Sequence, residues 1–330
     1  MIRTRAGTPR RSGRRSVRRV LGGARIVGGA VFLAVGTGLM LHVRQVMLRE
    51  ARHAREAAGA ARSVLLRPLP ARIDGLATAA AQLSADRGVS AGGDLYEVIA
   101  TEHGVRVVMG DVRGHGLAAV GTVAAVLGSF REAVHDEAEL AGVLTRLDRA
   151  LARHHRVHAR AEDTEDFVTV LLLEIAPDGA LHALNCGHPW PYLLSGGRAQ
   201  LVAPADPLPP LGLFPLPAEL PPTPCGHLLP GEALFLHTDG VEDARDEQGR
   251  FFPLAGALTE AVRGRPISPH SVLRELFTQL LRHAGGKPKD DIAILVLHNE
   301  RTLSSFRGAG NCATSHNVPA VDIPPVAPTP

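Results

Sequence analysis

Apolar and polar residues of this 330-residue chain fall into blocks that are typical of a layered α+β fold. Short apolar runs predict strands at 105–110, 233–237 and 292–297. Paired runs around Pro-Asp-Gly and Ser-Gly-Gly turns predict two β-hairpins, 167–175 with 180–186 and 192–194 with 199–202. Apolar residues at helical spacing predict helices at 117–134, 137–156 and 272–283. The Pro-rich stretch 203–230 is expected to be an irregular surface loop.

An uncharged segment near the N-terminus predicts a transmembrane helix. Residues 26–43 contain no charged side chain and lie between Arg25 and Arg44. At about 1.5 Å of rise per residue, this segment just reaches the length of a membrane span. A secretory signal is an alternative because a basic stretch precedes the apolar one, but no small-residue cleavage site follows. A buried helix of a soluble domain is the other alternative.

Charge is distributed unevenly along the chain. The formal net charge is +3, yet residues 1–25 contain nine arginines and no acidic residue, so the remainder is net acidic. We expect this basic arm to contact anionic lipid headgroups. Nucleic-acid binding is the alternative, but the arm contains no aromatic residue and adjoins the apolar segment.

Different features of the sequence favour different sides of the membrane for the domain. The positive-inside rule favours a cytoplasmic N-terminus, which would put the rest of the chain outside. Arginines also follow the span, at Arg44, Arg49, Arg52 and Arg55. The three cysteines, Cys186, Cys225 and Cys312, have no spacing typical of a disulfide framework or a zinc site. We therefore expect a single-pass protein of the cell membrane with a cytoplasmic domain.

These patterns predict five regions along the chain. A basic arm at 1–25 and the transmembrane helix at 26–43 are followed by a helical stalk at 44–64. One large domain is expected at 65–298. The polar, Pro-rich remainder, 299–330, is expected to be disordered.

Four aspartates, each beside a strand or a turn, are the candidate functional residues: Asp94, Asp111, Asp239 and Asp290. Taken singly, each also fits an ordinary turn or helix cap. Carboxylates gathered at strand ends repel one another, and hard cations such as Mg²⁺ or Mn²⁺ favour oxygen ligands of this kind. The recurrence of the pattern favours a metal site.

The motifs around these aspartates resemble those of one enzyme family. GGDLYE, GDVRGHG, FVTVLLLEI, NCGHPWPYLL, LPGEALFLHTDGVEDARDEQGRFF and KPKDDIAILVL occur in this order between residues 65 and 298. The series resembles the metal-dependent protein phosphatase (PPM) family, and within it the bacterial SpoIIE-type branch. The resemblance implies a four-layer α-β-β-α sandwich of two antiparallel sheets. It also implies two Mn²⁺ or Mg²⁺ ions at one end of the sandwich and hydrolysis of phosphoserine or phosphothreonine.

The resemblance also implies roles for individual residues. Asp111, helped by the Val112 carbonyl, would bridge both ions. The other expected metal ligands are Asp94, Asp239, Asp290 and, as a second choice to Asp290, Asp291. Asp111 and His115 are the candidate catalytic residues, with His115 a candidate acid for the leaving group. His188 fits a structural turn better than catalysis, and Arg113 fits a solvated side chain better than a phosphate ligand.

The leading hypothesis is therefore a membrane-anchored serine/threonine phosphatase. The resemblance implies a phosphorylated protein substrate, of which an anti-sigma factor antagonist is the usual example in this branch. The alternative is a non-catalytic, membrane-tethered interaction module on the same fold. Nucleic-acid binding through the basic arm is a third, weaker hypothesis, and no nucleic-acid partner is expected.

Overall fold

The structure is a computed structural model that describes the chain in several stretches. The described residues are 33, 36–50, 52–53, 57–61, 64–83, 92–114, 116–158, 167–264, 266–286 and 290–302. The chain divides into two units, Met1–Ala54 and Arg55–Pro330, which are taken separately.

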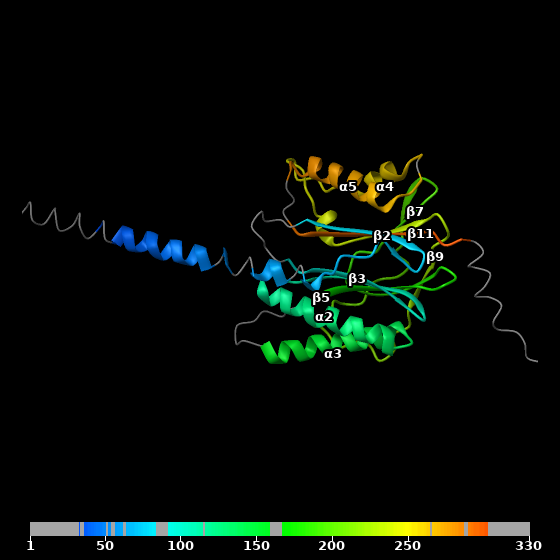
Figure 1. Ribbon diagram of the computed structural model, residues 1–330, viewed down its shortest axis with the longest axis horizontal. Helices are drawn as coiled ribbons and strands as arrows, with labels where there is room; N and C mark the ends of the chain where they lie inside the picture. The colour runs from blue at the N-terminus through cyan, green and yellow to red at the C-terminus, as the bar shows by residue number, and fades with distance from the viewer. Residues whose placement is uncertain are drawn as a thin grey trace, which may run out of the picture. The chain divides into compact units, whose positions relative to one another are not determined.

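The second unit is a sandwich of four layers, with two antiparallel sheets in the middle and a pair of helices on each outer face (Figure 1). This confirms the predicted α-β-β-α fold class. The arrangement follows from alternation within the strands, because successive side chains of a strand point to opposite faces. In the strand 104–112, Val107 and Met109 pack against the other sheet, while Val108 and Val112 pack against helices.

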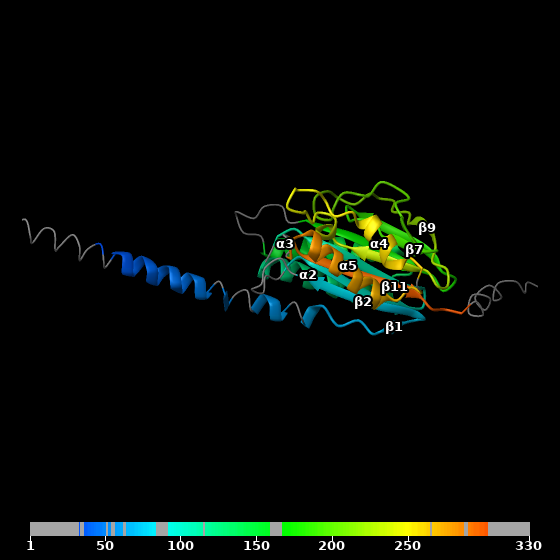
Figure 2. The same cartoon turned by 90° about the horizontal axis from the view of Figure 1, so that it is seen from above.

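The first sheet has six strands in the order β1-β2-β11-β10-β7-β8. Their bounds are Arg72–Ile73 (β1), Leu76–Leu83 (β2), Tyr192–Ser195 (β7), Arg198–Leu201 (β8), Ala233–His237 (β10) and Ile292–Asn299 (β11). The two central strands, β10 and β11, are almost entirely buried. Figure 2 shows the outer face of this sheet covered by α4 (Leu254–Val262) and α5 (Pro269–His283).

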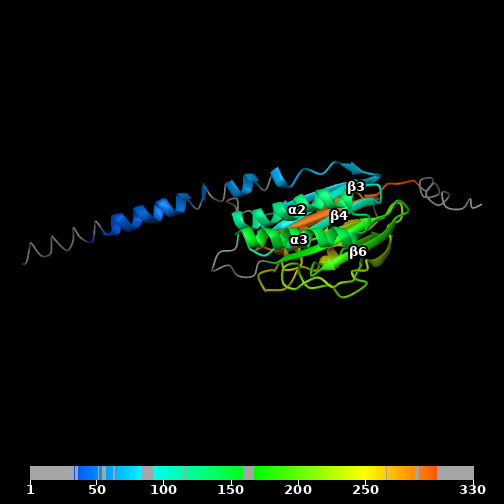
Figure 3. The same ribbon diagram turned by 90° about the horizontal axis from the view of Figure 1, so that it is seen from below.

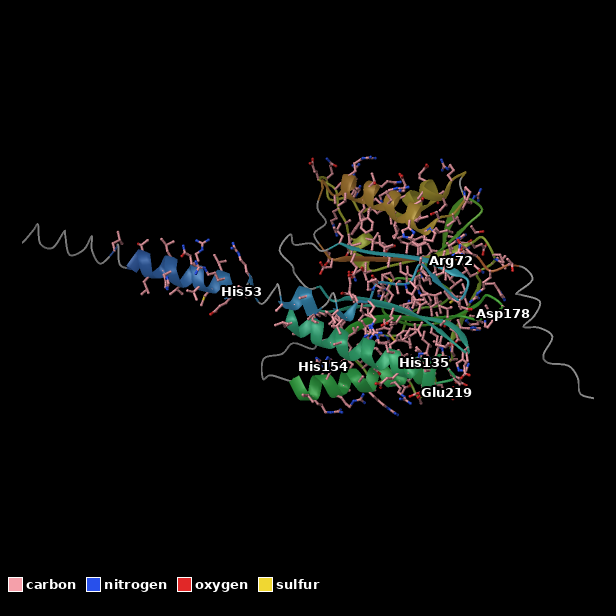
Figure 4. All side chains as sticks on the ribbon, in the orientation of Figure 1. His53, Arg72, His135, His154, Asp178 and Glu219 are labelled. Carbon is pink, nitrogen blue, oxygen red and sulfur yellow. The ribbon has the colours of Figure 1, made fainter. Side chains whose placement is uncertain are left out.

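The second sheet has five strands in the order β3-β4-β5-β6-β9. Their bounds are Asp94–Thr101 (β3), Gly104–Val112 (β4), Val168–Ile175 (β5), Ala180–Cys186 (β6) and Thr223–His227 (β9). Figure 3 shows its outer face covered by α2 (Leu117–Asp136) and α3 (Leu140–His158). The turn between β5 and β6, marked by Asp178 in Figure 4, lies at the end of the sheet away from Asp111.

Both predicted hairpins and all three predicted helices are present, but other elements were missed or misjudged. The strands β1, β2 and β3 and the helix α4 had no counterpart in the prediction. The stretch 203–230 was expected to be irregular throughout, which is wrong for β9, an edge strand that pairs with β6. Proline and glycine occur within β9, and such residues are tolerated in a strand mainly at a sheet edge.

Residues on both sides of the predicted domain, 65–298, contact it. On the N-terminal side, Ala58 is fully buried against Val120 of α2, so part of the predicted stalk belongs to the domain. On the C-terminal side, Arg301 donates hydrogen bonds to Asp74 and to the Ala176 carbonyl, at 2.6 and 2.8 Å. Disorder from residue 299 was therefore wrong as far as 302, and residues 303–330 lie outside the described part.

In the first unit, residues 36–50 form a helix whose apolar side chains are exposed, among them Leu39 and Met40. The basic arm and residues 26–32 and 34–35 of the predicted span lie outside the described residues. Within the described part of the chain, the helix with the length and apolarity of a membrane span is α2. Half of that window is buried in the domain, as expected for a core helix packed on the five-stranded sheet.

Candidate functional site

Asp94 and Asp111 face each other on neighbouring strands at one end of the five-stranded sheet. Asp94 opens β3, Asp111 lies near the end of β4, and the antiparallel register places them directly opposite. Strand alternation turns both side chains toward the other sheet, because their neighbours Leu95 and Val112 pack against the helices. Asp94 is only 2% exposed, and a side-chain hydrogen bond joins the two aspartates.

Two glycines make room for these carboxylates. A side chain at Gly93 would collide with the Val112 carbonyl and would lie 2.8 Å from Asp111 Oδ1. At Gly92, the position of a side chain is already taken by the Asp291 carboxylate. The glycine pair in Gly-Gly-Asp therefore lets the start of β3 approach both β4 and the segment before β11.

Asp239 comes from the six-stranded sheet. It opens a short 3₁₀ helix, Asp239–Val241, directly after β10. Thr238 fixes this turn to β11, because its backbone N–H donates to the Ala293 carbonyl and its hydroxyl accepts from the Ala293 N–H, at 3.1 and 2.9 Å. The following Gly240 packs against the Asp291 backbone, where a side chain would not fit.

Asp290 and Asp291 lie just before β11. Asp290 Oδ1 accepts a 2.8 Å hydrogen bond from the Asp291 backbone N–H. The two carboxylates are not equivalent in their surroundings: both act electrostatically on Asp111, whereas only Asp290 is among the causes of the shift at Asp239. The preference for Asp290 over Asp291 as a metal ligand stays a prediction.

The pKa values of the aspartates reflect this crowding. Burial raises the pKa of Asp111 to about 7, and the negative charges of three further aspartates, Asp239, Asp290 and Asp291, raise it too. Burial also raises the pKa of Asp239, with smaller contributions from Asp290 and Asp243. The structure thus brings together, from two sheets, all five aspartates that the sequence singled out.

Thr169, which the sequence analysis did not single out, binds the backbone of Asp111. Thr169 of β5 lies opposite Asp111, and its hydroxyl accepts a 3.2 Å hydrogen bond from the Asp111 backbone N–H. The same hydroxyl lies 3.0 Å from Nδ1 of His188. The available signal was a threonine facing the other sheet within a largely apolar strand.

His188 is buried, and Asn185 holds its backbone. The Asn185 side chain donates to the His188 carbonyl and accepts from the His188 N–H, at 2.9 and 2.8 Å. Burial lowers the pKa of His188 to about 3, and the neighbouring His237 contributes to this shift. His188 is therefore neutral near pH 7 and serves the turn after β6.

Of the two remaining candidates, His115 and Arg113, the structure describes only Arg113. His115 lies outside the described residues, so its role as an acid stays a prediction. Arg113 is exposed, its guanidinium lies 5.2 Å from the centroid of the Phe167 ring, and its backbone N–H donates to the Phe167 carbonyl at 3.0 Å.

The chemical nature of the oxygen donors at this site suits a hard divalent cation. Carboxylates and a backbone carbonyl are the ligands that Mg²⁺ and Mn²⁺ prefer, and the five aspartates provide no softer ligand. In the arrangement described here, no three His, Cys, Asp or Glu side chains of the described residues form a ready coordination shell. The aspartates are electrostatic neighbours, and a cation would offset the repulsion that raises the Asp111 pKa.

Solved structures share this fold. The RsbU and RsbW domains of a Mycobacterium tuberculosis protein match with 24% identity and a TM-score of 0.53, covering 68% of this chain and 60% of that one. The SiaA-PP2C domain of Pseudomonas aeruginosa matches with 21% identity and a TM-score of 0.59, covering 77% and 98%. The PP2C phosphatase domain of SpoIIE from Bacillus subtilis, with part of its regulatory domain, matches with 16% identity and a TM-score of 0.53, covering 68% and 63%.

The chain thus spans less than two thirds of the length of the first and third of these proteins. A search of the curated proteins found no match. The model of one protein family, described as stage II sporulation protein E (SpoIIE), matches residues 101–300, which is more than half of the chain. The chain therefore belongs to the SpoIIE family, whose fold is that of the PP2C-type (PPM) serine/threonine phosphatases.

Proposed function

We propose that this protein is a metal-dependent protein phosphatase that hydrolyses phosphoserine or phosphothreonine. The observation that carries the proposal is that Asp111 of the five-stranded sheet meets Asp239 and Asp290, which adjoin strands of the six-stranded sheet, at one end of the sandwich. Membership of the SpoIIE family supports the same reaction class.

The aspartates have separate parts in this proposal. Asp111, with the Val112 carbonyl, and Asp94 would hold cations on the side of the five-stranded sheet, and Asp239 with Asp290 or Asp291 on the other side. Two bound Mn²⁺ or Mg²⁺ ions would supply Lewis-acid activation of water and offset the charge of the phosphate.

The surrounding residues position and protect this cluster. Thr169 holds the backbone of Asp111, and Thr238 ties the turn that carries Asp239 to β11. Arg113 follows Val112 directly, but its exposed guanidinium near the Phe167 ring fits the expected solvated side chain better than a phosphate ligand. The displaced serine or threonine oxygen needs a proton, for which His115 is the candidate.

The test is hydrolysis of p-nitrophenyl phosphate and of a phosphoserine peptide with and without Mn²⁺. We expect Mn²⁺-dependent turnover that falls by about two orders of magnitude or more in Asp111→Asn and in Asp239→Asn. Asp178→Asn is the matched control, since Asp178 lies in the β5–β6 turn at the other end of the sheet. Undiminished turnover in Asp111→Asn, or no Mn²⁺ binding by calorimetry, would refute the assignment and favour a non-catalytic interaction module.

We further propose that the substrate is a phosphorylated regulatory protein, such as an anti-sigma factor antagonist. The support is the family and the fold shared with an RsbU domain that occurs in one protein with an RsbW domain. Incubation of candidate phosphoproteins with the enzyme, followed by mass measurement, would show loss of one phosphate from a true substrate. Candidates that keep their phosphate while the phosphoserine peptide is hydrolysed would contradict this substrate class.

Membrane anchoring through residues 26–43 is part of the proposal. Its support is the uncharged sequence of this segment and the exposure of apolar side chains in the described part of the helix, such as Leu39 and Met40. A C-terminal reporter fusion should report a cytoplasmic domain in the membrane fraction. A signal from outside the cytoplasm would reverse the proposed topology, and a soluble product would remove the anchor.

A further inference from the structure

A cleft of about 480 Å³ is lined in part by residues that follow Asp239 closely in the chain, and it has no part in the chemistry proposed above. Its apolar lining includes Tyr192, Phe252 and Leu254, which are buried, and the more exposed Phe251. Glu242 and Asp243 complete the lining. Among the described residues that line the cleft, these two are acidic and none is basic.

The cleft is joined to the candidate metal site by a short piece of backbone. The Asp243 N–H donates a 2.8 Å hydrogen bond to the Asp239 carbonyl. The residues that follow Asp239 therefore pass directly from the proposed metal site into the lining of the cleft. An extended peptide advances about 3.3 Å per residue, so a bound phosphopeptide needs only a few residues to reach this lining.

Contacts within the protein hold several residues of the lining. Glu242 Oε1 accepts a hydrogen bond from the Tyr192 hydroxyl at 3.4 Å. The hairpin that carries Phe251 is closed by a 2.9 Å hydrogen bond from the Phe252 N–H to the Ala244 carbonyl. The Arg245 guanidinium lies 3.9 Å from the centroid of the Phe251 ring and holds that ring, but it does not line the cleft.

We propose that this cleft is a substrate subsite for an arginine side chain near the phosphorylated residue of the protein substrate. The inference rests on the proposed phosphatase function. The methylene groups and guanidinium plane of an arginine would lie on the aromatic lining, and its charge would face Glu242 and Asp243. Acidic residues at the same position of the substrate would be disfavoured, because both charged residues that line the cleft are carboxylates.

The experiment uses the full-length enzyme with Mn²⁺ and a set of phosphoserine peptides in which one arginine is moved along an alanine and glycine background. We expect one position, within about four residues of phosphoserine, at which arginine raises kcat/KM about five- to tenfold over alanine. Lysine at that position should help less, and glutamate should lower kcat/KM below the alanine value. The preference should shrink as NaCl is raised.

Three variants locate the preference. Glu242→Gln and Phe251→Ala should reduce the ratio of arginine to alanine peptide to about one to two, since each removes one side of the subsite. Glu247→Gln removes an exposed carboxylate of the same hairpin that does not line the cleft, and it should keep the wild-type ratio.

The outcomes separate this inference from the proposed function. Hydrolysis of all peptides at equal rates, or a preference that survives in both Glu242→Gln and Phe251→Ala, would overturn the subsite and leave the phosphatase assignment intact. If wild type releases no phosphate from any peptide or from p-nitrophenyl phosphate, the phosphatase assignment fails. Fluorescence anisotropy with labelled peptides then tests the cleft by itself, and equal affinity for arginine and alanine peptides would overturn the subsite.

Discussion

Arg106 Nε donates a 2.8 Å hydrogen bond to Glu174 Oε2 across the pair β4 and β5, and the Arg106 side chain is completely buried. Its remaining donors reach the end of α2, where Nη1 donates to the Val134 carbonyl at 3.1 Å. Further bonds from Arg106 go to the carbonyls of Glu137 and Ala138. One guanidinium thus satisfies the free carbonyls at a helix end and joins that helix to the sheet.

Replacing Arg106 should therefore be costly. Arg106→Met leaves the Glu174 carboxylate and several buried carbonyls without their donor, and we expect a loss of about 3–5 kcal/mol in the free energy of unfolding. Urea unfolding followed by circular dichroism measures it. The control is Arg146→Met, which removes a half-exposed arginine paired with Asp136 and Glu137 and should cost much less than Arg106→Met. Similar losses for both variants would contradict a special role for the buried arginine.

Two glycine substitutions should have different effects, one on Mn²⁺ affinity and the other on stability. Gly93→Ala places a methyl group against the Val112 carbonyl and Asp111 Oδ1, and we expect Mn²⁺ affinity to fall about tenfold or more by calorimetry. Gly128→Ala lies on the exposed face of α2, where a methyl group meets no atom within 4 Å. It should stabilise the protein by about 0.5–1 kcal/mol with Mn²⁺ affinity unchanged. Unchanged Mn²⁺ affinity in Gly93→Ala would remove that glycine from the site.

The strands that the sequence did not predict have physical reasons for their weak signal. β2 reads Leu-Ala-Thr-Ala-Ala-Ala-Gln-Leu, and alanine has low strand propensity, so its conformation comes from its register with β11. β3 carries Glu97 inside the domain, which breaks the apolar pattern. The structure compensates with Arg131, whose Nε lies 2.8 Å from one Glu97 carboxylate oxygen. Tertiary partners of this kind cannot be read from one sequence.

The sequence predicted some residues of the candidate site but not how they lie relative to one another. Motifs around Asp94, Asp111 and Asp239 singled these residues out, because glycines and strand ends beside an aspartate leave a readable pattern. That Asp94 lies opposite Asp111 depends on the register of β3 and β4, which a sequence does not specify. Thr169 was missed because one threonine in an apolar strand is ordinary, and its contact with Asp111 follows from the register of β4 and β5.

Removing one carboxylate from the cluster should stabilise the metal-free protein. Burial and the neighbouring aspartates raise the pKa of Asp111 to about 7, so its charged form is unfavourable in the folded state. In EDTA at pH 8, Asp111→Asn should therefore raise the free energy of unfolding by about 1–2 kcal/mol. Mn²⁺ should raise the melting temperature of wild type more than that of the variant, by mass action.

The control for this effect is Asp178→Asn, which changes an exposed turn aspartate outside the cluster. Its stability in EDTA should match that of wild type to within about 0.5 kcal/mol. A less stable Asp111→Asn protein in EDTA would show that Asp111 is held by favourable contacts rather than strained by repulsion.

The buried His188 should make the domain sensitive to mild acid. Burial lowers its pKa to about 3 in the folded state, against about 6.5 in the unfolded chain, so the unfolded state binds the extra proton in this window. The stability contributed by neutral His188 is complete above about pH 6.5 and is lost as the pH falls toward about 3.

His188→Gln should destabilise the protein at pH 7, because Thr169 loses its partner, but this difference from wild type should shrink by about 1–2 kcal/mol at pH 5. Urea midpoints of both proteins at pH 5, 6 and 7 measure the change, and the titration of the aspartates cancels because both proteins share it. His270→Gln, a change of an exposed histidine, should follow the wild-type profile. A gap between His188→Gln and wild type that stays constant from pH 7 to pH 5 would show that His188 is not held neutral.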